Sequence, residues 1–497
     1  MMKYFSLFFI IATIVSGCSV KVNAASILLN LHARSMQSPQ AGINPISENG
    51  PPQPTDVPSL PVFYYNQTID HFDKNSGTFL QRYYINSTFY KEGGPIFLHT
   101  PGETGINPII TTSSFVSELA TSFNGLLISI EHRYYGESYP PINDLSTPNM
   151  KFLTVDQALL DFANFIKYPP QELNIAKDSK WITVGGSYAG NLATWMREKF
   201  PNLVFAAYVS SAPIEAKLDF FEFDQGVVNA LPCAQNISDA FKFVYDPILM
   251  SGNDSAILEL KQQFGLEMLQ DNKDFASAIS HPTASIVQNY VPPQTPDQPD
   301  PILSICAPFA QSSSPEISAF IYSEGVKAFL NLTGVITPED KLAQFATTSI
   351  STTEKNDLAP YTYQYCNELG YYQTFPKSSS LSTRSQIIDI DYYQGQCNFL
   401  FPGIVSSPTI QKTNKKFGGF NGKFSRTVFV NGDIDPWTAL TVSSKSANPK
   451  VEGNTIFLVK GGSHVRDFAP PSPSDSDSLN EARTFVYNTL AKWLYKK

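Results

Sequence analysis

One serine, Ser187, lies in a sequence context that is typical of a catalytic nucleophile. Residues 181–190 read WITVGGSYAG, so an apolar run precedes two glycines and the serine. The run 181–184 predicts a buried strand, and residues 188–200 predict a helix. A serine in a glycine-rich turn between strand and helix has the layout of a nucleophile elbow, where only small neighbours fit. The usual second glycine is Ala189 here, which is small enough for the turn.

A base and an acid are expected where later strands end. His464 follows the apolar run 455–459, and Asp433 and Asp435 follow the run 426–430. The chain order Ser, Asp, His is that of α/β-hydrolases. Asp435 is the preferred acid because the proline after it would hold a sharp turn, and Asp433 would then brace the same loop. The other histidines precede the serine or lie in a helical insertion: His32, His71, His99, His132 and His281.

These residue types together predict hydrolysis through a covalent intermediate. A serine hydroxyl is a weak nucleophile until a base accepts its proton. His464 would accept that proton, and Asp435 would hold the ring tautomer and stabilise the imidazolium. The backbone N–H of Tyr188 and that of Gly102 or Glu103, in a glycine-containing loop after a predicted strand, would bind the oxyanion. This chemistry requires no metal ion and no organic cofactor.

Strand and helix patterns divide the chain into a core and an insertion. Apolar strand runs alternate with helices in residues 61–213 and again in 356–497. Residues 214–355 have mostly helical patterns, such as 264–269 and 316–330, broken by polar loops. A chain of 497 residues exceeds the usual size of one core. The sequence therefore predicts an α/β-hydrolase fold with a mostly helical cap inserted between the two parts of the core.

The N-terminus predicts export from the cytosol. Lys3 precedes the apolar run 5–15, and small residues follow, so residues 1–24 resemble a secretory signal peptide. Residues 25–60 are rich in Ser, Pro, Gln and Asn, which is typical of a flexible leader. No later run is long enough for a transmembrane segment in the mature chain. The formal net charge of −9 argues against a nucleic-acid partner. We expect a secreted or lysosomal or vacuolar protein.

The cysteines and sequons agree with export. Four cysteines follow the signal peptide, and an even count in an exported chain predicts two disulfides. Of the three possible pairings we favour Cys233–Cys306 and Cys366–Cys397, because each pair lies within one predicted unit. Five sequons allow N-glycosylation, at Asn66, Asn86, Asn236, Asn253 and Asn331.

Six stretches together resemble the prolyl-carboxypeptidase family of serine peptidases, which includes Pro-X carboxypeptidase, lysosomal dipeptidyl peptidase and thymus-specific serine protease branches. The likeness is greatest to the thymus-specific branch. The stretches are IDHFDKNSGTFLQRYYIN (69–86), ISIEHRYYGES (128–138), GGSYAGNLATWMREKFPNLVFAAYVSSAPIEAKLDFFEF (185–223), ELGYYQT (368–374), VNGDIDPW (430–437) and GGSHVRDFAPPSPSDS (461–476).

The resemblance implies an α/β-hydrolase fold with a helical cap and a triad of Ser187, Asp435 and His464. It also implies cleavage of peptides next to proline in many members, often in acidic compartments. Where relatives have a His-His pair, this chain has His464 followed by Val465, so the second histidine has no counterpart.

We therefore predict a serine exopeptidase that cleaves short peptides, with the cap restricting access to chain ends. Carboxypeptidase and dipeptidyl peptidase action both stay open, and Glu368 or Glu103 are candidates to bind a substrate amine. The alternatives are an esterase or lipase on the same fold, and a catalytically silent hydrolase fold used for binding. Peptide substrates are the expected partners, and a homodimer is left open.

Overall fold

The computed structural model describes residues 60–377, 381–404, 408–443, 450–452 and 455–495. The predicted signal peptide and the leader up to residue 59 lie outside this range. Among the described residues, no helix combines the length and the apolar character that a membrane span requires.

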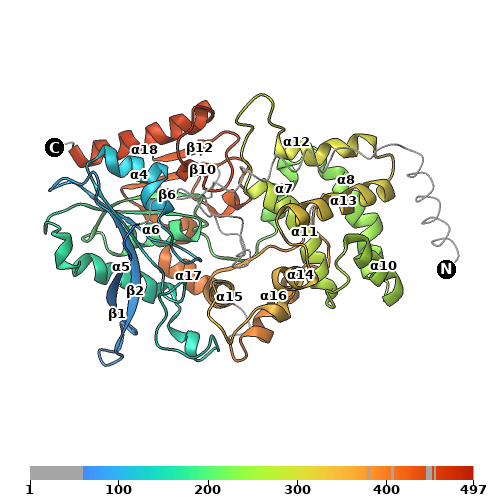
Figure 1. The fold of residues 1–497 in the computed structure, drawn as a ribbon, viewed down its shortest axis with the longest axis horizontal. Coiled ribbons are helices and arrows are strands. Elements are labelled where there is room, and N and C mark those ends of the chain that lie inside the picture. Colours follow the sequence, from blue (N-terminus) through green and yellow to red (C-terminus); the bar gives the residue numbers. More distant parts are fainter. Residues whose placement is uncertain (1–59, 378–380, 405–407, 444–449, 453–454, 496–497) are drawn as a thin grey trace.

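Eight strands form one mixed sheet, which lies in the left half of the view in Figure 1. Their order is β1-β2-β4-β3-β5-β6-β10-β12. β2 pairs antiparallel with β1 and β4, and the pairs from β4 through β12 are parallel. The strands are Phe63–Thr68, Thr78–Asn86, Ile96–His99, Leu126–Ile130, Trp181–Gly186, Val204–Ser210, Thr427–Gly432 and Ile456–Val459, for β1 to β6, β10 and β12. The mostly parallel sheet confirms the α/β class and the predicted α/β-hydrolase fold.

Helices cover both faces of this sheet. Helices α4 (Phe115–Ser122) and α18 (Asp477–Tyr495) pack on one face, and α5 (Val155–Lys167) and α6 (Tyr188–Lys199) pack on the other. Side chains of a strand point alternately to the two faces. In β3, Ile96 and Leu98 accordingly join the cluster of α5 and α6, whereas Phe97 joins that of α4 and α18. The central strands are apolar on both sides because both sides are covered.

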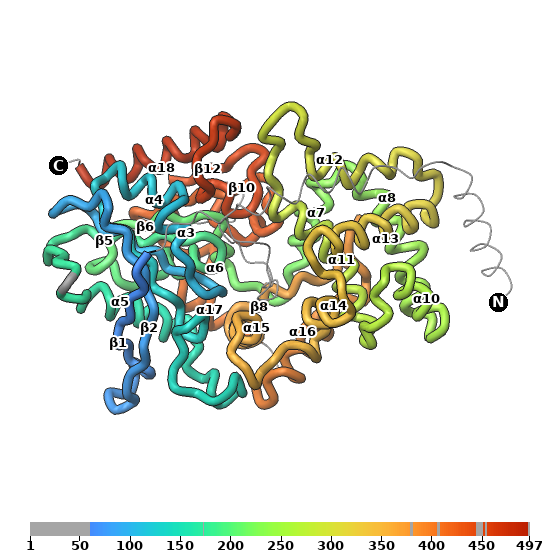
Figure 2. Tube along the Cα trace, viewed as in Figure 1, coloured from blue at the N-terminus to red at the C-terminus, as the bar shows by residue number. Residues whose placement is uncertain are grey.

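A large helical region lies between β6 and β10 in the chain. Among the described residues there, none joins the eight-stranded sheet, which resumes only at β10. Figure 2 shows the chain leaving the sheet in green through α7–α10 and returning in yellow and orange through α13–α17. Helices therefore continue beyond residue 355, the predicted end of the cap. They are α7 Glu222–Ala230, α8 Ala234–Ala240, α9 Asp246–Leu249, α10 Asp254–Phe264, α11 Asn272–Gln288, α12 Pro301–Cys306, α13 Pro315–Leu332, α14 Pro338–Phe345, α15 Leu358–Gln364, α16 Ile390–Leu400 and α17 Ile410–Phe417.

One helical expectation in this region is wrong. The pattern 316–330 lies inside α13, but residues 264–269 do not form a helix. Helix α10 ends at Phe264 because Gly265 takes a left-handed conformation, with φ of 66°. Glycine adopts that conformation without a steric penalty and commonly ends helices.

Two disulfides and one continuous core hold the helical region together. Cys233 pairs with Cys306, and Cys366 pairs with Cys397, as the sequence predicted. A short parallel pair of strands, β7 (Lys217–Asp219) and β8 (Gly370–Tyr372), joins the beginning of this region to its later part. A single cluster of buried side chains extends from the strands through α6 and α7 to α11. Close packing of this kind fixes the helical region against the carboxyl edge of the sheet.

Candidate active site

Ser187 occupies a strained turn between β5 and α6. Its φ of 56° and ψ of −135° lie outside the regions that L-residues favour. A Cβ on Gly185 would lie 2.1 Å from the Ala189 carbonyl oxygen, and one on Gly186 would lie 2.5 Å from a methyl carbon of Val465. Both positions therefore require glycine because of close approach. Such strain is kept where the surroundings fix it and is typical of functional turns.

His464 and Asp435 form a buried hydrogen-bonded pair. Nδ1 of His464 lies 2.9 Å from Oδ2 of Asp435, and both side chains are fully buried. The other carboxylate oxygen, Oδ1, accepts a 2.9 Å hydrogen bond from the N–H of Trp437. Among the described residues, Nε2 of His464 has no hydrogen-bond partner although it is buried. A carboxylate on Nδ1 places the ring proton there, so the lone pair is on Nε2.

Asp433, the alternative acid, has a different contact. Its side chain is exposed, and its Oδ1 accepts a 2.7 Å hydrogen bond from the N–H of Gly461. This bond ties the end of β10 to the turn after β12. Of the two aspartates, the structure places Asp435 against His464 and Asp433 at the base of the loop.

The histidine loop docks directly on the elbow. The N–H of Val465 donates a 3.0 Å hydrogen bond to Oγ of Ser211, and the Val465 side chain packs on Gly186. The N–H of Ser187 in turn donates to the carbonyl of Ser210 at 2.9 Å. The residues next to His464 and Ser187 in the chain are thus in contact with each other or with the end of β6.

The loop after β3 lies against the first turn of α6. A Cβ on Gly102 would lie 3.1 Å from the Ala189 backbone nitrogen, and Oγ1 of Thr100 donates to the Ala189 carbonyl at 3.0 Å. Burial raises the pKa of the neighbouring Glu103 carboxyl, and a hydrogen bond from its own backbone N–H lowers it by less. The structure therefore brings Gly102 and Glu103 beside Tyr188.

The side chain of Tyr188 is held by neighbours from other elements. Its hydroxyl accepts a 2.6 Å hydrogen bond from the Gln364 amide and lies 3.3 Å from Nε2 of His132. Nδ1 of His132 lies 2.7 Å from the Arg133 carbonyl, and burial lowers the pKa of this histidine to about 4. A neutral His132 therefore serves as a support for Tyr188 near neutral pH.

The other histidines in the described residues make contacts that support the fold. His71 lies 2.7 Å from Asp161, and His99 lies 2.8 Å from Ser129. Burial lowers the pKa values of His99 and His281 to about 4, which keeps both rings neutral near pH 7. His32 lies outside the described residues.

Two residues of the site were missed by sequence reasoning. The carbonyl of Gln288, at the end of α11, accepts a 3.1 Å hydrogen bond from the N–H of His464. Its side-chain Oε1 accepts a 3.0 Å bond from the indole N–H of Trp437. The sequence near Gln288 carries no local signal for this role. Trp437 adjoins the predicted acid, and its position in the DIDPW segment was the one available hint.

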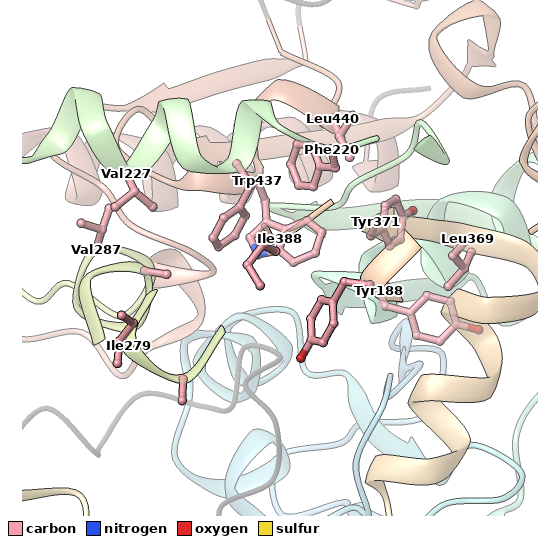
Figure 3. Packing of buried hydrophobic residues seen from close by; sticks show 14 of the residues in the cluster. Tyr188, Phe220, Val227, Ile279, Val287, Leu369, Tyr371, Ile388, Trp437 and Leu440 are labelled. Atoms are coloured by element: carbon pink, nitrogen blue, oxygen red, sulfur yellow. The ribbon is translucent and has the colours of Figure 1, made fainter. Parts of the chain in front are cut away.

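Trp437 stands in a layer of aromatic rings (Figure 3). Its ring centroid lies 5.3 Å from that of Phe220, 5.5 Å from Phe223, 5.6 Å from Tyr371 and 6.0 Å from His464. On the side of α11, Trp437 and Gln288 border a cavity of about 190 Å³. Trp437 thus forms part of the wall of this cavity and lies against the ring of the histidine.

Glu368, a predicted anchor for a substrate amine, contacts the beginning of α5. Its Oε2 accepts a 2.9 Å hydrogen bond from the Val155 N–H at the beginning of α5. Burial raises its pKa to about 7. It is not among the residues that line the cavity. No group of three or more metal-ligating side chains was found in the described part of the chain.

The predicted glycosylation sites differ in exposure. Asn66, Asn253 and Asn331 are exposed. Asn86 and Asn236 are half-buried, and their amide groups donate to the Thr111 carbonyl and to the hydroxyl of Ser318.

Comparison with known proteins identifies the family. The model of the family described as serine carboxypeptidase S28 matches residues 67–486. The chain is 30% identical to the thymus-specific serine protease of Homo sapiens, over 87% of this chain and 86% of that protein. It is also 30% identical to a putative serine protease of Caenorhabditis elegans, over 87% and 88%. An α/β hydrolase fold protein of Nakamurella multipartita shares 12% identity at a TM-score of 0.34, over 86% and 99%. The chain is a serine-type peptidase and belongs to the serine carboxypeptidase S28 family.

Proposed function

We propose that this protein is a serine exopeptidase that cleaves short peptides through an acyl-enzyme on Ser187. His464 is the general base and Asp435 orients it. The observation that carries this proposal is the buried His464–Asp435 hydrogen bond, on a loop that docks on the Ser187 turn. Within the part of the chain that the structure describes, Nε2 of this histidine has no partner. Such a group is a ready proton acceptor in a water-poor site.

The proposed residues can carry out each bond change and proton transfer of this reaction. Oγ of Ser187 attacks the scissile carbonyl carbon while Nε2 of His464 takes the hydroxyl proton. Collapse of the tetrahedral intermediate breaks the C–N bond, and His464 returns the proton to the leaving amine. Water then attacks the acyl-enzyme by the same route in reverse, releasing the new carboxylate. Asp435 stays ionised and stabilises the imidazolium throughout.

The oxyanion of the intermediate would be bound by the N–H groups of Tyr188 and Gly102. Gly102 is preferred to Glu103 as the second donor. The close packing of Gly102 on the beginning of α6 supports this choice. Each donor of this kind contributes about 3–4 kcal/mol to transition-state stabilisation.

Exopeptidase action and a preference for proline are supported by the surroundings of the pair. A cavity of about 190 Å³ is smaller than the roughly 300–1,000 Å³ of pockets for drug-sized ligands, so it suits the end of a chain. Its wall includes Trp437 and Tyr371, whose rings offer flat apolar surfaces for a compact ring such as proline. A relative from Arthroderma benhamiae, 30% identical, is described as a probable extracellular serine carboxypeptidase.

Product analysis of a peptide library tests this proposal. The purified protein is incubated with peptides that carry proline at each position in turn, and the products are identified by mass spectrometry. We expect only terminal residues or dipeptides to be released, mainly next to proline. Internal cleavage, or turnover of short-chain esters without turnover of any peptide, would contradict exopeptidase action.

We further propose that the protein is exported through its signal peptide to the cell exterior or to a lysosome-like compartment and is glycosylated. Asn66, Asn253 and Asn331 are the exposed acceptors. Treatment of the natural protein with an N-glycosidase should lower its mass. It should also convert the asparagine at each of these positions to aspartate. An unchanged mass would contradict glycosylation.

A further inference from the structure

The cavity beside the active site contains a charged residue with no assigned role. Arg384 is only 5% exposed and is one of the residues that line the cavity. Among the described lining residues, no carboxylate is present and no other side chain carries a permanent positive charge. Burial lowers the pKa of His281, which also lines the cavity, to about 4, so this ring adds no charge near neutral pH.

Within the described residues, few groups bond the guanidinium of Arg384. Its buried Nε has no hydrogen-bond partner there, and Nη2 makes one long bond of 3.4 Å to the Gln373 side chain. Burial raises the pKa of the nearby Tyr393 hydroxyl, and Arg384 lowers it by less. Within the described parts of the chain, Arg384 forms no ion pair. A buried, unpaired charge is costly, so a fold that keeps one usually supplies a partner at another stage of function.

Two buried carboxylates, Asp224 and Asp246, hold the backbone around Arg384. Asp224 accepts hydrogen bonds from Oγ of Ser382 and from the N–H and hydroxyl of Thr383. Asp246 accepts from the hydroxyl of Ser385 and from a neighbouring N–H. The chain is thus fixed on both sides of Arg384, although Asp224 still attracts the guanidinium at longer range. A fixed backbone lowers the entropy lost when the side chain binds an anion.

The cavity is in contact with the catalytic residues through two walls. Gln288 and Trp437 line it, and they contact the N–H and the ring of His464. Tyr371 also lines it, and its hydroxyl accepts a 3.1 Å hydrogen bond from Asn191, one turn after Ser187 in α6. The cavity thus borders the residues that hold His464 and the first turns of α6.

We propose that Arg384 binds the C-terminal carboxylate of the peptide substrate, so that the enzyme acts as a carboxypeptidase. The planar guanidinium matches a carboxylate in shape and charge. The residue that carries this carboxylate lies in the aromatic cavity, and its amino group is the leaving group. This inference rests on the proposed function, because it assigns the cavity to the substrate of Ser187. Arg384 is a specificity residue and takes no part in bond breaking.

Matched peptides with free and amidated C-termini test this role. We expect the wild-type enzyme to cleave the free acid with kcat/KM about 10- to 100-fold above that of the amide, because one charge-assisted hydrogen-bonded pair is lost. In R384Q, kcat/KM for the free acid should fall to the value for the amide, mainly because KM rises. The value of kcat/KM for the amide should be unchanged. R384K retains the charge without the planar fork and should lie between them. Equal losses on both peptides, or no wild-type preference, would overturn the proposal.

Three controls separate this role from misfolding and from failure of the proposed function. Turnover of a small uncharged ester should be the same in R384Q and the wild type, which shows that the variant is folded. An amidated peptide that ends in glutamate should behave like other amides, and recovery to the level of the free acid would overturn recognition of the terminal carboxylate. Binding of the free acid and the amide to S187A, measured by calorimetry, reports on Arg384 without catalysis. If S187A binds the free acid more tightly than the amide but turnover does not depend on Ser187, only the role of Ser187 as nucleophile is refuted. If S187A binds both peptides equally, the role of Arg384 in binding the carboxylate is refuted.

Discussion

The carboxyl edge of the sheet and the cavity of the helical region differ in how their residues are brought together. At the sheet edge, Ser187, Asp435 and His464 each follow a strand directly, and β5, β6, β10 and β12 are consecutive neighbours in the sheet. In the helical region, the walls of the cavity come from separate helices and from the aromatic layer around Trp437. The residues proposed for chemistry are therefore placed by strand ends, and those proposed for substrate recognition are placed by long-range packing.

The largest expected effect comes from removing the acid at the sheet edge. D435N keeps the shape of the side chain but favours the wrong tautomer of His464, so kcat should fall about 10³–10⁴-fold. D433N is the matched control, because Asp433 bonds Gly461 and lies on the surface. Steady-state kinetics on one peptide compares both variants. A larger loss in D433N than in D435N would reverse the assignment of the acid.

A smaller loss of activity is expected when a methyl group is added to the turn that carries Ser187. In G186A the added methyl group would meet Val465, which adjoins His464, so the histidine loop must shift. A displacement of about 1 Å lowers activity roughly 100-fold. We would measure kcat together with the rate of labelling by a fluorophosphonate. Unchanged values for both would show that the contact between the loop and the elbow does not position the histidine.

The stability of the contact between the helical region and α5 should depend on pH through Glu368. Burial raises its pKa to about 7 in the folded protein, above the ordinary value of 4.5 for a glutamate carboxyl. The folded state then binds the proton more tightly, so this group stabilises the protein at low pH and loses that effect as pH rises from about 4.5 to 7. E368Q, which has no such proton, should gain about 1–3 kcal/mol relative to the wild type between pH 5 and 8.

Denaturant unfolding of both proteins at pH 5 and pH 8 measures this difference. Glutamine can still accept the hydrogen bond from the N–H of Val155, so local contacts are retained in the variant. Parallel pH dependences of the two free energies of unfolding would show that Glu368 does not titrate in this range.

The smallest effect is expected at a glycine of the helical region. Gly325 lies in the middle of α13, and a Cβ there would meet no atom within 4 Å. Because glycine weakens a helix, G325A should raise the free energy of unfolding by about 0.5–1 kcal/mol and leave kcat unchanged. Denaturant unfolding and peptide kinetics check both. A loss of stability would indicate a crowded environment, like that of Gly186.

The sequence predicts the sheet and the residues at its carboxyl edge better than it predicts the cavity of the helical region. Periodic apolar residues predict the central strands and the helices α5, α6, α13 and α18, because each of these elements buries a continuous face. The end of α10 at Gly265 was missed because an apolar pattern continues past it, and the backbone conformation of one glycine decides the boundary. Gln288 and Arg384 gave no local signal. Their positions depend on contacts with residues far away in the chain, such as Trp437 and Asp224.

The most direct test of the account is to locate the nucleophile. The protein is labelled with a fluorophosphonate, digested, and analysed by tandem mass spectrometry, with S187A treated in parallel. We predict a single adduct on Ser187 in the wild type, together with loss of peptide hydrolysis in proportion to labelling, and neither labelling nor hydrolysis in S187A. An adduct on another residue, or peptide hydrolysis retained by S187A, would contradict the account.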